Sequence, residues 1–248
     1  MAPLNITILG AGISGLTAAL GLRKNGHNVT LLEKSTQHRE AGAAIHLGPN
    51  GSGIMINLGF RPEKVGANLF TGWAGYNAAG EAKMKMELRE VNKQWANPWF
   101  CVHRQDLHQE LRRLVLDPHG QGPVPKLQLG CTVVDIDVEA GSVKLKDGRV
   151  FENDVVIGAD GNFSFARTQI DANVKPYAWG KTAYRWLVPR DELLADPQTN
   201  ELIGEEGWFG EISEADRRIV MYSCRDNTEM NFVAFVPNDE ATNVGNGN

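Results

Sequence analysis

The segment from residue 4 to residue 33 contains the pattern that most limits what this chain can fold into. Alternating apolar residues lead into Gly10, Gly12 and Gly15, and Glu33 ends the next apolar stretch. Gly10 permits a tight turn, Gly12 lets the backbone approach a diphosphate, and Gly15 lets a helix lie close to the first strand. The free N–H groups at the start of that helix would hold the diphosphate. The segment therefore predicts a Rossmann-like strand-helix-strand unit that binds a dinucleotide.

Glu33 limits which dinucleotide such a unit would hold. A carboxylate at the end of the second strand accepts hydrogen bonds from ribose hydroxyls, and it would repel a 2′-phosphate. The resident dinucleotide is thus expected to be FAD or NAD rather than NADP. A glycine turn that holds no ligand is the alternative, and the strand, helix, strand and acid in register argue against it.

Composition and charge exclude several other classes of protein. The 248 residues have a formal net charge of -5 and a pI near 5.7, which argues against a broad surface for nucleic acid or anionic lipid. No apolar run approaches the ~20 residues of a membrane span, and a strand that begins by Leu4 leaves no room for a signal peptide, so we expect a cytoplasmic protein. Cys101, Cys131 and Cys224 are widely spaced, which predicts neither a disulfide framework nor a metal site.

A small-residue strand follows the first unit. Gly42, Ala43 and Ala44 have almost no side-chain bulk, so they would either admit a flat ring against the backbone or pack closely on a neighbouring segment. The spacing alone does not choose between these two. His46 follows in the same segment, GAAIHLGPN, and either projects towards a bound ring or is a solvated loop histidine.

Two later segments also place polar side chains where a ligand would lie. Arg104 stands just before a predicted helix, HRQDLHQELRRLV, where it would contact a phosphate or a ring carbonyl unless it is simply a solvated charge. Residues 127–160 alternate in short strands, and the last one, DVVIG, is continuously apolar as a buried parallel strand should be. Asp160 and Gly161 follow it, at the end of the strand that faces the ligand crevice, and Ser164 is expected to cap the next helix.

Four motifs in this order, GAGISG with Glu33, GAAIHLGPN, HRQDL and DVVIGADGNFSFAR, resemble the class A FAD-dependent aromatic hydroxylases, and most closely the members similar to salicylate hydroxylase. The resemblance extends from Ile6 to about Pro237. It implies that the first motif binds the ADP half of FAD, that the arginine of HRQDL lies on the cofactor, and that the Asp-Gly pair serves both FAD and a passing nicotinamide cofactor. The cofactor-binding residues expected on this basis are Gly10, Gly12, Gly15, Glu33, Ala44, Arg104, Asp160 and Gly161.

The resemblance also implies a reaction. NADH or NADPH would reduce FAD, O2 would add to the flavin, and the flavin hydroperoxide would hydroxylate an aromatic or phenolic small molecule. No residue is assigned as catalytic, and no metal is required. Aromatic side chains in residues 174–236 would form either the core of a sheet or the wall of a substrate site. Tyr184, Arg185 and His46 are the candidate substrate contacts.

The predicted fold class is α/β, with a Rossmann-like FAD-binding domain built on a parallel sheet plus a β-meander, and a second, mostly β substrate domain. Residues 1–68 and 100–171 are assigned to the FAD-binding domain, residues 69–99 and 172–236 to the substrate domain, and residues 237–248 to a flexible polar tail. The Gly-Asp segment that follows in the family is absent, so the last part of the family fold is expected to be missing. Self-association or a partner would then cover an exposed sheet edge.

Two further functions stay open at this point. The first is a non-redox relative that binds an aromatic ligand or acts in biosynthesis like a cyclase, with weak or no FAD binding, and the missing Gly-Asp segment favours it. The second is an NAD-dependent dehydrogenase that uses only the N-terminal unit. The β-meander before DVVIGADG argues against it, because a second nucleotide-binding half would continue in simple strand-helix alternation.

Overall fold

The chain divides into two compact units in a computed structural model that describes residues 2–36, 42–203 and 205–241. Unit 1 comprises residues 1–40 and 108–177, and unit 2 comprises residues 41–107 and 178–248. These boundaries differ from the predicted domains, because residues 42–68 and 100–107 belong to the compact body of unit 2. The assignment of those residues to FAD binding remains a functional prediction.

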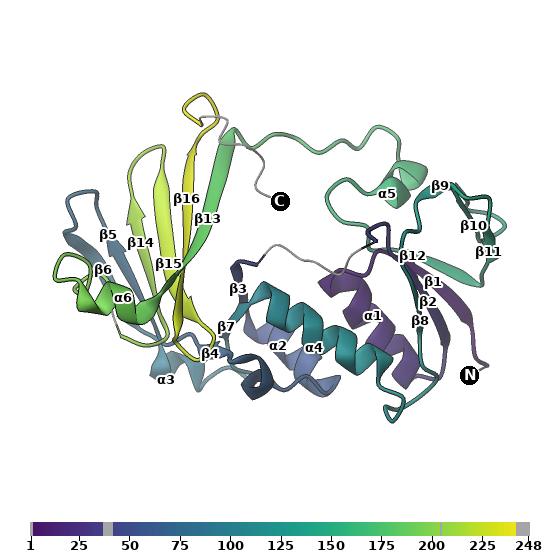
Figure 1. The fold of residues 1–248 in the computed structure, drawn as a ribbon, viewed down its shortest axis with the longest axis horizontal. Helices are drawn as coiled ribbons and strands as arrows, with labels where there is room; N and C mark the ends of the chain where they lie inside the picture. The colour runs from purple at the N-terminus through teal and green to yellow at the C-terminus, as the bar shows by residue number, and fades with distance from the viewer. Residues whose placement is uncertain (1, 37–41, 204, 242–248) are drawn as a thin grey trace. The chain divides into compact units, whose positions relative to one another are not determined.

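Unit 1 contains the predicted parallel sheet (Figure 1). Its four strands lie in the order β12-β1-β2-β8, and every neighbouring pair is parallel. The strands are β1 (Asn5–Leu9), β2 (Asn28–Leu32), β8 (Lys126–Gln128) and β12 (Val155–Gly158). Helix α1 (Ile13–Lys24) connects the two central strands, and Leu16 and Leu20 on this helix are buried, as the apolar pattern of the segment predicts.

The β-meander of unit 1 is a separate antiparallel sheet in the order β11-β10-β9. Its strands are β9 (Val133–Asp137), β10 (Ser142–Leu145) and β11 (Val150–Glu152). Val143 and Leu145 of β10 are fully buried or nearly so, and they share a core with Leu9 and Leu32 at the ends of the parallel strands. The meander therefore covers the ends of β1 and β2, the two strands that lead into the glycine turn and into Glu33. Helix α5 (Phe165–Ile170) follows β12. Helix α4 spans Arg104–Leu116, and its residues from His108 onward belong to unit 1.

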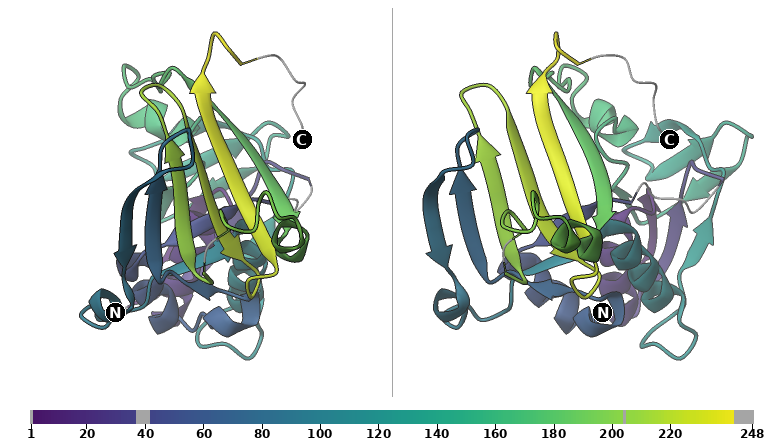
Figure 2. Two further views of the ribbon diagram at one scale, coloured as in Figure 1. Left: turned by 90° about the vertical axis from the view of Figure 1, so that its left-hand side faces the viewer. Right: turned by 60° about the vertical axis from the view of Figure 1, so that its left-hand side comes forward.

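Unit 2 is built on a six-stranded sheet in the order β13-β16-β15-β14-β5-β6. Only the β14–β5 pair is parallel. The strands are β5 (Gly72–Tyr76), β6 (Ala82–Glu87), β13 (Lys181–Pro189), β14 (Trp208–Ser213), β15 (Arg218–Cys224) and β16 (Glu229–Pro237). Helix α6 (Arg190–Ala195) lies across one face of this sheet, where Leu193 packs with Met221 and Met230 (Figure 2).

The opposite face of the six-stranded sheet packs against smaller elements of unit 2. These include a three-stranded antiparallel sheet in the order β3-β7-β4. Its strands are β3 (Ala44–Leu47), β4 (Asn68–Leu69) and β7 (Phe100–His103), and the remaining elements of the unit are α2 (Pro49–Asn57), a 3-10 turn (Pro62–Val65) and α3 (Arg89–Asn92). The buried residues shared by the two sheets include Ala44, Cys101, Tyr222 and Val233. We call this side of the six-stranded sheet the inner face. The last seven residues of the predicted polar tail lie outside the described residues.

Candidate functional site

The glycine turn of unit 1 has the geometry that the sequence predicts. Gly10 has a φ of 99°, and a Cβ at this position would lie 2.5 Å from the carbonyl oxygen of Ala159. A Cβ at Gly15 would lie only 2.0 Å from the carbonyl oxygen of Gly10. Because a side chain is excluded at both positions, the helix can begin directly beside the end of β1.

The start of α1 offers N–H groups to a ligand. Its N-cap is Gly12, which has an extended backbone, contributes no side-chain cap, and is followed by a first turn without an acidic residue. A Cβ at Gly12 would meet no described atom within 4 Å, so space is open at this point. Uncapped N–H groups at the positive end of a helix favour a negatively charged group such as a diphosphate. The residues present at this turn therefore fit the diphosphate of a dinucleotide.

Glu33 lies beside the same turn and is held in place by the backbone. Its Oε2 accepts a hydrogen bond from the N–H of Ala11 at 2.8 Å, and its Oε1 accepts one from the N–H of Ser35 at 2.8 Å. A carboxylate oxygen has a further lone pair, so both oxygens can still accept from ribose hydroxyls. The carbonyl oxygen of Ala11 lies 2.8 Å from Nε2 of His108 on α4. Sequence reasoning missed His108, because its partner is 97 residues away.

Asp160 has a structural role in addition to the predicted one. It accepts hydrogen bonds from Oγ of Ser164 at 2.5 Å and from the N–H groups of Phe165 and Ala166 at 2.6 Å and 3.1 Å. Burial by itself would raise the pKa of Asp160, but these hydrogen bonds lower it below its ordinary value. Asp160 thus fixes the start of α5, where Ser164 is the predicted N-cap. Gly161 has a φ of 81°, and a Cβ there would meet no described atom within 4 Å.

The small-residue strand belongs to unit 2 and is packed closely there. The carbonyl oxygen of Ala44 accepts a hydrogen bond from the Tyr222 hydroxyl at 2.7 Å, and the Ala44 N–H donates to Oδ1 of Asn231 at 3.0 Å. A Cβ at Gly42 would lie 2.8 Å from Nε2 of His103. Of the two alternatives for this segment, close packing on a neighbour is the one observed at Gly42 and Ala44.

His46 lies in strand β3 within a cluster of aromatic rings. Its ring centroid is 4.4 Å from that of Tyr222, and its Nδ1 is 3.7 Å from Sγ of Cys101. The aromatic cluster consists of His46, Phe70, Trp99, Phe209 and Tyr222, whose rings lie within 5.8 Å of that of His46. The expectation of a solvated loop histidine is therefore wrong, because β3 turns this side chain towards the sheet core.

The environment of His46 gives the protein a specific response to acid. Burial lowers the pKa of His46 to about 4, whereas the unfolded chain takes up this proton near pH 6.5. The contribution of His46 to the free energy of unfolding should therefore be fully present above pH 6.5 and should fall as the pH drops towards 4. We expect wild type to lose about 2 to 3 kcal/mol more than His46→Phe between pH 7 and pH 4.5, measured by urea unfolding. Equal losses in the two proteins would show that His46 is not protonated on unfolding.

The two other candidate substrate residues lie on opposite faces of the six-stranded sheet. In β13, Arg185 pairs with Val233 and Tyr184 with Ala234, so the strand pleat separates their side chains. Arg185 shares the inner face with Tyr222, and its charge acts to lower the Tyr222 pKa, which burial nevertheless raises. A site on one face of this sheet can therefore use only one of the two, and Arg185 is the one on the side of the aromatic cluster.

The start of α4 is held by an ion pair that the motif alone did not indicate. Arg225 donates to both carboxylate oxygens of Asp106 at 2.6 Å and 2.9 Å, and its Nη2 lies 3.1 Å from Nδ1 of His103. Burial by itself would raise the pKa of Asp106, but Arg225 lowers it overall. The pair fixes the turn that contains Arg104, whose N–H donates to the carbonyl oxygen of Ala43 at 2.9 Å. No local sequence signal identifies Arg225, because it follows Asp106 by 119 residues.

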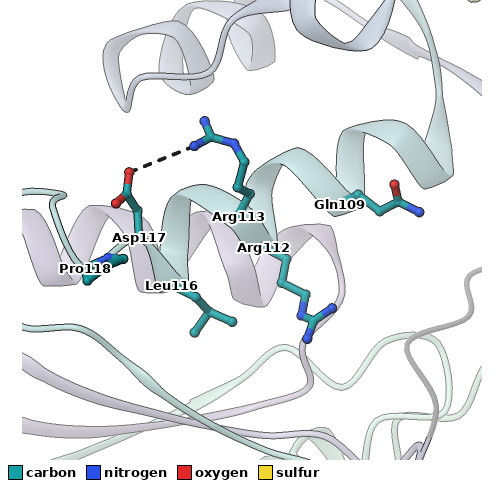
Figure 3. A pocket seen from close by; sticks show the side chains of 6 residues that line it. All are labelled: Gln109, Arg112, Arg113, Leu116, Asp117 and Pro118. Carbon is teal, nitrogen blue, oxygen red and sulfur yellow. Dashed lines mark ion pairs between the residues drawn. The ribbon is translucent and has the colours of Figure 1, made fainter.

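A pocket of about 420 Å³ lies along α4 and the turn after it, and none of these candidate residues lines it. Figure 3 shows Arg113 directed towards Asp117, with which it forms an ion pair at 3.9 Å. The other residues that line it are Gln109, Arg112, Leu116 and Pro118. Within the part of the chain that the structure describes, no group of three potential metal ligands gathers, and no helix is long and apolar enough to cross a membrane.

The structure brings together Gly10, Gly12, Gly15, Glu33 and Asp160 in unit 1, where a Cβ at Gly10 would lie 3.1 Å from Cα of Asp160. Gly161 follows directly. The remaining candidates, Ala44, His46, Arg104, Tyr184 and Arg185, belong to unit 2.

Comparison with known proteins agrees with the geometry of unit 1. Residues 8–81 match the model of the NAD(P)-binding Rossmann-like domain family. The chain is 38% identical to the FAD-dependent monooxygenase cfoG of Aspergillus candidus, over 97% of this chain and 57% of that protein. It is 33% identical to hispidin-3-hydroxylase of Neonothopanus nambi, over 96% of this chain and 59% of that protein. The chain thus spans less than three fifths of the length of these relatives.

A solved structure of 2-methyl-3-hydroxypyridine-5-carboxylic acid oxygenase in its tetrameric form has the same fold. It superposes with a TM-score of 0.79 at 24% identity, over 99% of this chain and 62% of that one. The family resemblance expected from the four motifs is confirmed, and so is the combination of a Rossmann-like sheet with a mostly β unit. Over the residues it spans, this chain is similar to FAD-dependent monooxygenases and hydroxylases.

Proposed function

We propose that unit 1 binds the ADP half of FAD at the turn between β1 and α1. The observation that carries this proposal is the uncapped start of α1 at Gly12, which faces open space beside the fixed carboxylate of Glu33. The N–H groups that follow Gly12 would hold the diphosphate, and Glu33 would accept the ribose hydroxyls. Gly161, with open space at its Cα, would let the backbone after β12 approach the cofactor.

We propose further that the whole protein is a monooxygenase that hydroxylates an aromatic small molecule with O2 and NADH or NADPH. The two relatives reported above, a monooxygenase and a hydroxylase, support this. FAD would supply the redox chemistry and the activation of oxygen. The chain's own part would be to bind and orient the aromatic ring and to exclude water.

Particular residues of unit 2 are suited to that part. The aromatic cluster offers an apolar wall with a neutral imidazole, and Arg185 places a cation on the same face of the sheet. We propose Arg185 and His46 as substrate contacts. For Arg104 and Ala44, the role in cofactor binding stays a prediction from the family resemblance. Tyr184 is not retained beside Arg185, because it lies on the other face of the sheet.

The test is a titration with FAD, followed by reduction with each nicotinamide cofactor with and without phenols. Gly12→Ala is the variant that tests the diphosphate site, because its Cβ would contact no described protein atom yet would enter the space proposed for the diphosphate. We expect Gly12→Ala to bind FAD at least about 10-fold more weakly, a difference of ~1.4 kcal/mol, with an unchanged melting temperature. Flavin fluorescence quenching measures the affinity, and circular dichroism measures the melting.

Two results would contradict the proposal. One is a wild-type protein that takes up no FAD, and the other is a Gly12→Ala variant that binds FAD as tightly as wild type. Phenol-stimulated reduction of bound FAD would support the proposed activity directly.

Self-association, or a partner at the edge strand β12, is also proposed. Val155 on this strand and several apolar residues after it are exposed, among them Phe163, Ile170 and Tyr177. A monomeric elution volume at micromolar concentration would count against it. The cytoplasmic location expected from the sequence stays a prediction, which fractionation of cells that contain the protein would test.

A further inference from the structure

Asn231 in β16 has a buried side-chain amide whose oxygen accepts a hydrogen bond and whose nitrogen donates none to a described residue. The side chain is fully buried, and its Oδ1 accepts the hydrogen bond from the Ala44 N–H at 3.0 Å. This bond fixes the orientation of the amide, because the flipped amide would point one donor at another. Its Nδ2 has no hydrogen-bond partner among the described residues. A buried donor without a partner is costly, so a native protein usually supplies an acceptor.

Asn231 lies next to the aromatic cluster on the inner face. It is paired with Tyr222 on β15, and Tyr222 is paired with Phe209 on β14. Residues directly opposite in adjacent antiparallel strands point to the same side, so Asn231 extends a row that contains two members of the cluster. Arg185 stands on the same face, two residues from Leu187, the partner of Asn231 on β13.

A second buried donor in the aromatic cluster also has no partner. Nε1 of Trp99 makes no hydrogen bond to any described residue, and the Trp99 ring centroid is 5.8 Å from that of His46. The Tyr222 hydroxyl, by contrast, already donates to the Ala44 carbonyl oxygen. Two unused donors beside five aromatic rings match a ligand that combines a flat apolar ring with an oxygen acceptor.

We propose that Nδ2 of Asn231 donates a hydrogen bond to a phenolic oxygen of an aromatic ligand bound against this cluster. The inference rests on the proposed function and makes it more specific, because it assigns a polar contact that selects phenols over purely apolar rings. A site built to satisfy an oxygen rejects the analogue that lacks it, since the buried donor is then left unpaired.

The experiment compares 2-naphthol with 2-methylnaphthalene, a pair that differs only in the oxygen, by isothermal titration calorimetry on the full chain. Wild type should bind 2-naphthol more tightly. In Asn231→Leu, which keeps the side-chain volume and removes the donor, the preference should fall by about 10-fold or more. Asn68→Leu is the matched control, because it removes another buried amide of unit 2, one that donates to Oγ of Ser223 at 3.0 Å and lies outside the aromatic cluster. It should retain the preference.

Several outcomes would overturn the inference. They are a wild type that shows no preference, an Asn231→Leu variant that keeps it, and an Asn68→Leu variant that loses it equally. The second would mean that water satisfies the donor, and the third that the loss of any buried amide of unit 2 abolishes the preference. A flavin ring carbonyl has similar acceptor chemistry, so FAD affinity is measured in parallel. Weaker FAD binding in Asn231→Leu with an unchanged naphthol preference would assign the acceptor to the flavin and overturn the inference.

The same measurements separate this inference from the proposed cofactor. A wild type that binds no FAD, yet prefers 2-naphthol and loses that preference in Asn231→Leu, would contradict the FAD proposal and support the inference. A wild type that binds FAD but shows no preference for 2-naphthol would support the FAD proposal and contradict the inference about Asn231.

Discussion

Replacing Arg23 with methionine is expected to lower the free energy of unfolding by about 4 kcal/mol. Arg23 lies in the last turn of α1 and is only 1% exposed. Its guanidinium donates to backbone carbonyl oxygens at 2.7 to 3.2 Å rather than to a carboxylate. The acceptors are the carbonyl oxygens of Leu114, Val115, Asp117, Gly120 and Gly122.

The size of this effect follows from where those carbonyls lie. The last carbonyls of a helix have no partner within the helix, and the negative end of the helix dipole favours a cation. Arg23 meets both needs at the end of α4, and it also fixes the turn that follows. Methionine would fill much of the volume but would leave several buried acceptors without a donor. Lysine should recover only part of the loss, because an ammonium cannot reproduce the planar fork of donors.

Urea unfolding followed by circular dichroism measures this prediction, and Arg149→Met is the matched control. Arg149 is exposed and pairs with Asp147 at 2.8 Å, so its loss should change the free energy of unfolding much less than the loss of Arg23 does. If Arg23→Met and Arg149→Met unfolded at the same urea concentration, the carbonyl cluster would not be a significant source of stability.

The second large effect is expected for Gly15→Ala, at about 3 kcal/mol of destabilisation. The added Cβ would lie 2.0 Å from the carbonyl oxygen of Gly10, a distance that no real contact of this kind allows. The obstacle is backbone rather than a flexible side chain, so α1 must move away from β1. That movement would also displace the N–H groups of the helix start, and FAD binding should be lost together with stability.

Gly12→Ala provides the contrast for this experiment. The two variants add the same methyl group, three residues apart, to the same turn. Gly12→Ala should weaken FAD binding alone, whereas Gly15→Ala should lower both the unfolding midpoint in urea and the affinity for FAD. A Gly15→Ala protein with the stability of wild type would show that α1 does not approach β1 as closely as the structure indicates.

The N-terminal unit could be predicted from the sequence because its constraints are local. Gly10, Gly15 and Glu33 all act within one strand-helix-strand segment, where the geometry of the turn leaves few choices of residue. The four motifs in order were also enough to predict the family. The same local argument failed for His46, because whether a histidine is solvated depends on what packs over it, and rings from two other strands and two loops do so.

The pairings in unit 2 could not be predicted from the sequence. Tyr184 and Arg185 are neighbours in the chain, and only the register of β13 against β16 shows that they serve opposite faces. Ala44 meets Asn231 across 187 residues, and Asp106 meets Arg225 across 119. Such contacts are fixed by the order of strands in the sheet, which no motif in the sequence specifies.

The sequence by itself therefore determined the glycine turn, the acid beside it and the family resemblance, because each depends on residues within short segments. The tertiary structure alone decided which donors are buried without partners, which cation stabilises the end of α4, and on which face of the sheet a ligand would find Arg185. These depend on the environment that distant segments create around a side chain. Burial and hydrogen bonding with distant residues, rather than residue type, decide whether such a group is structural or available to a ligand.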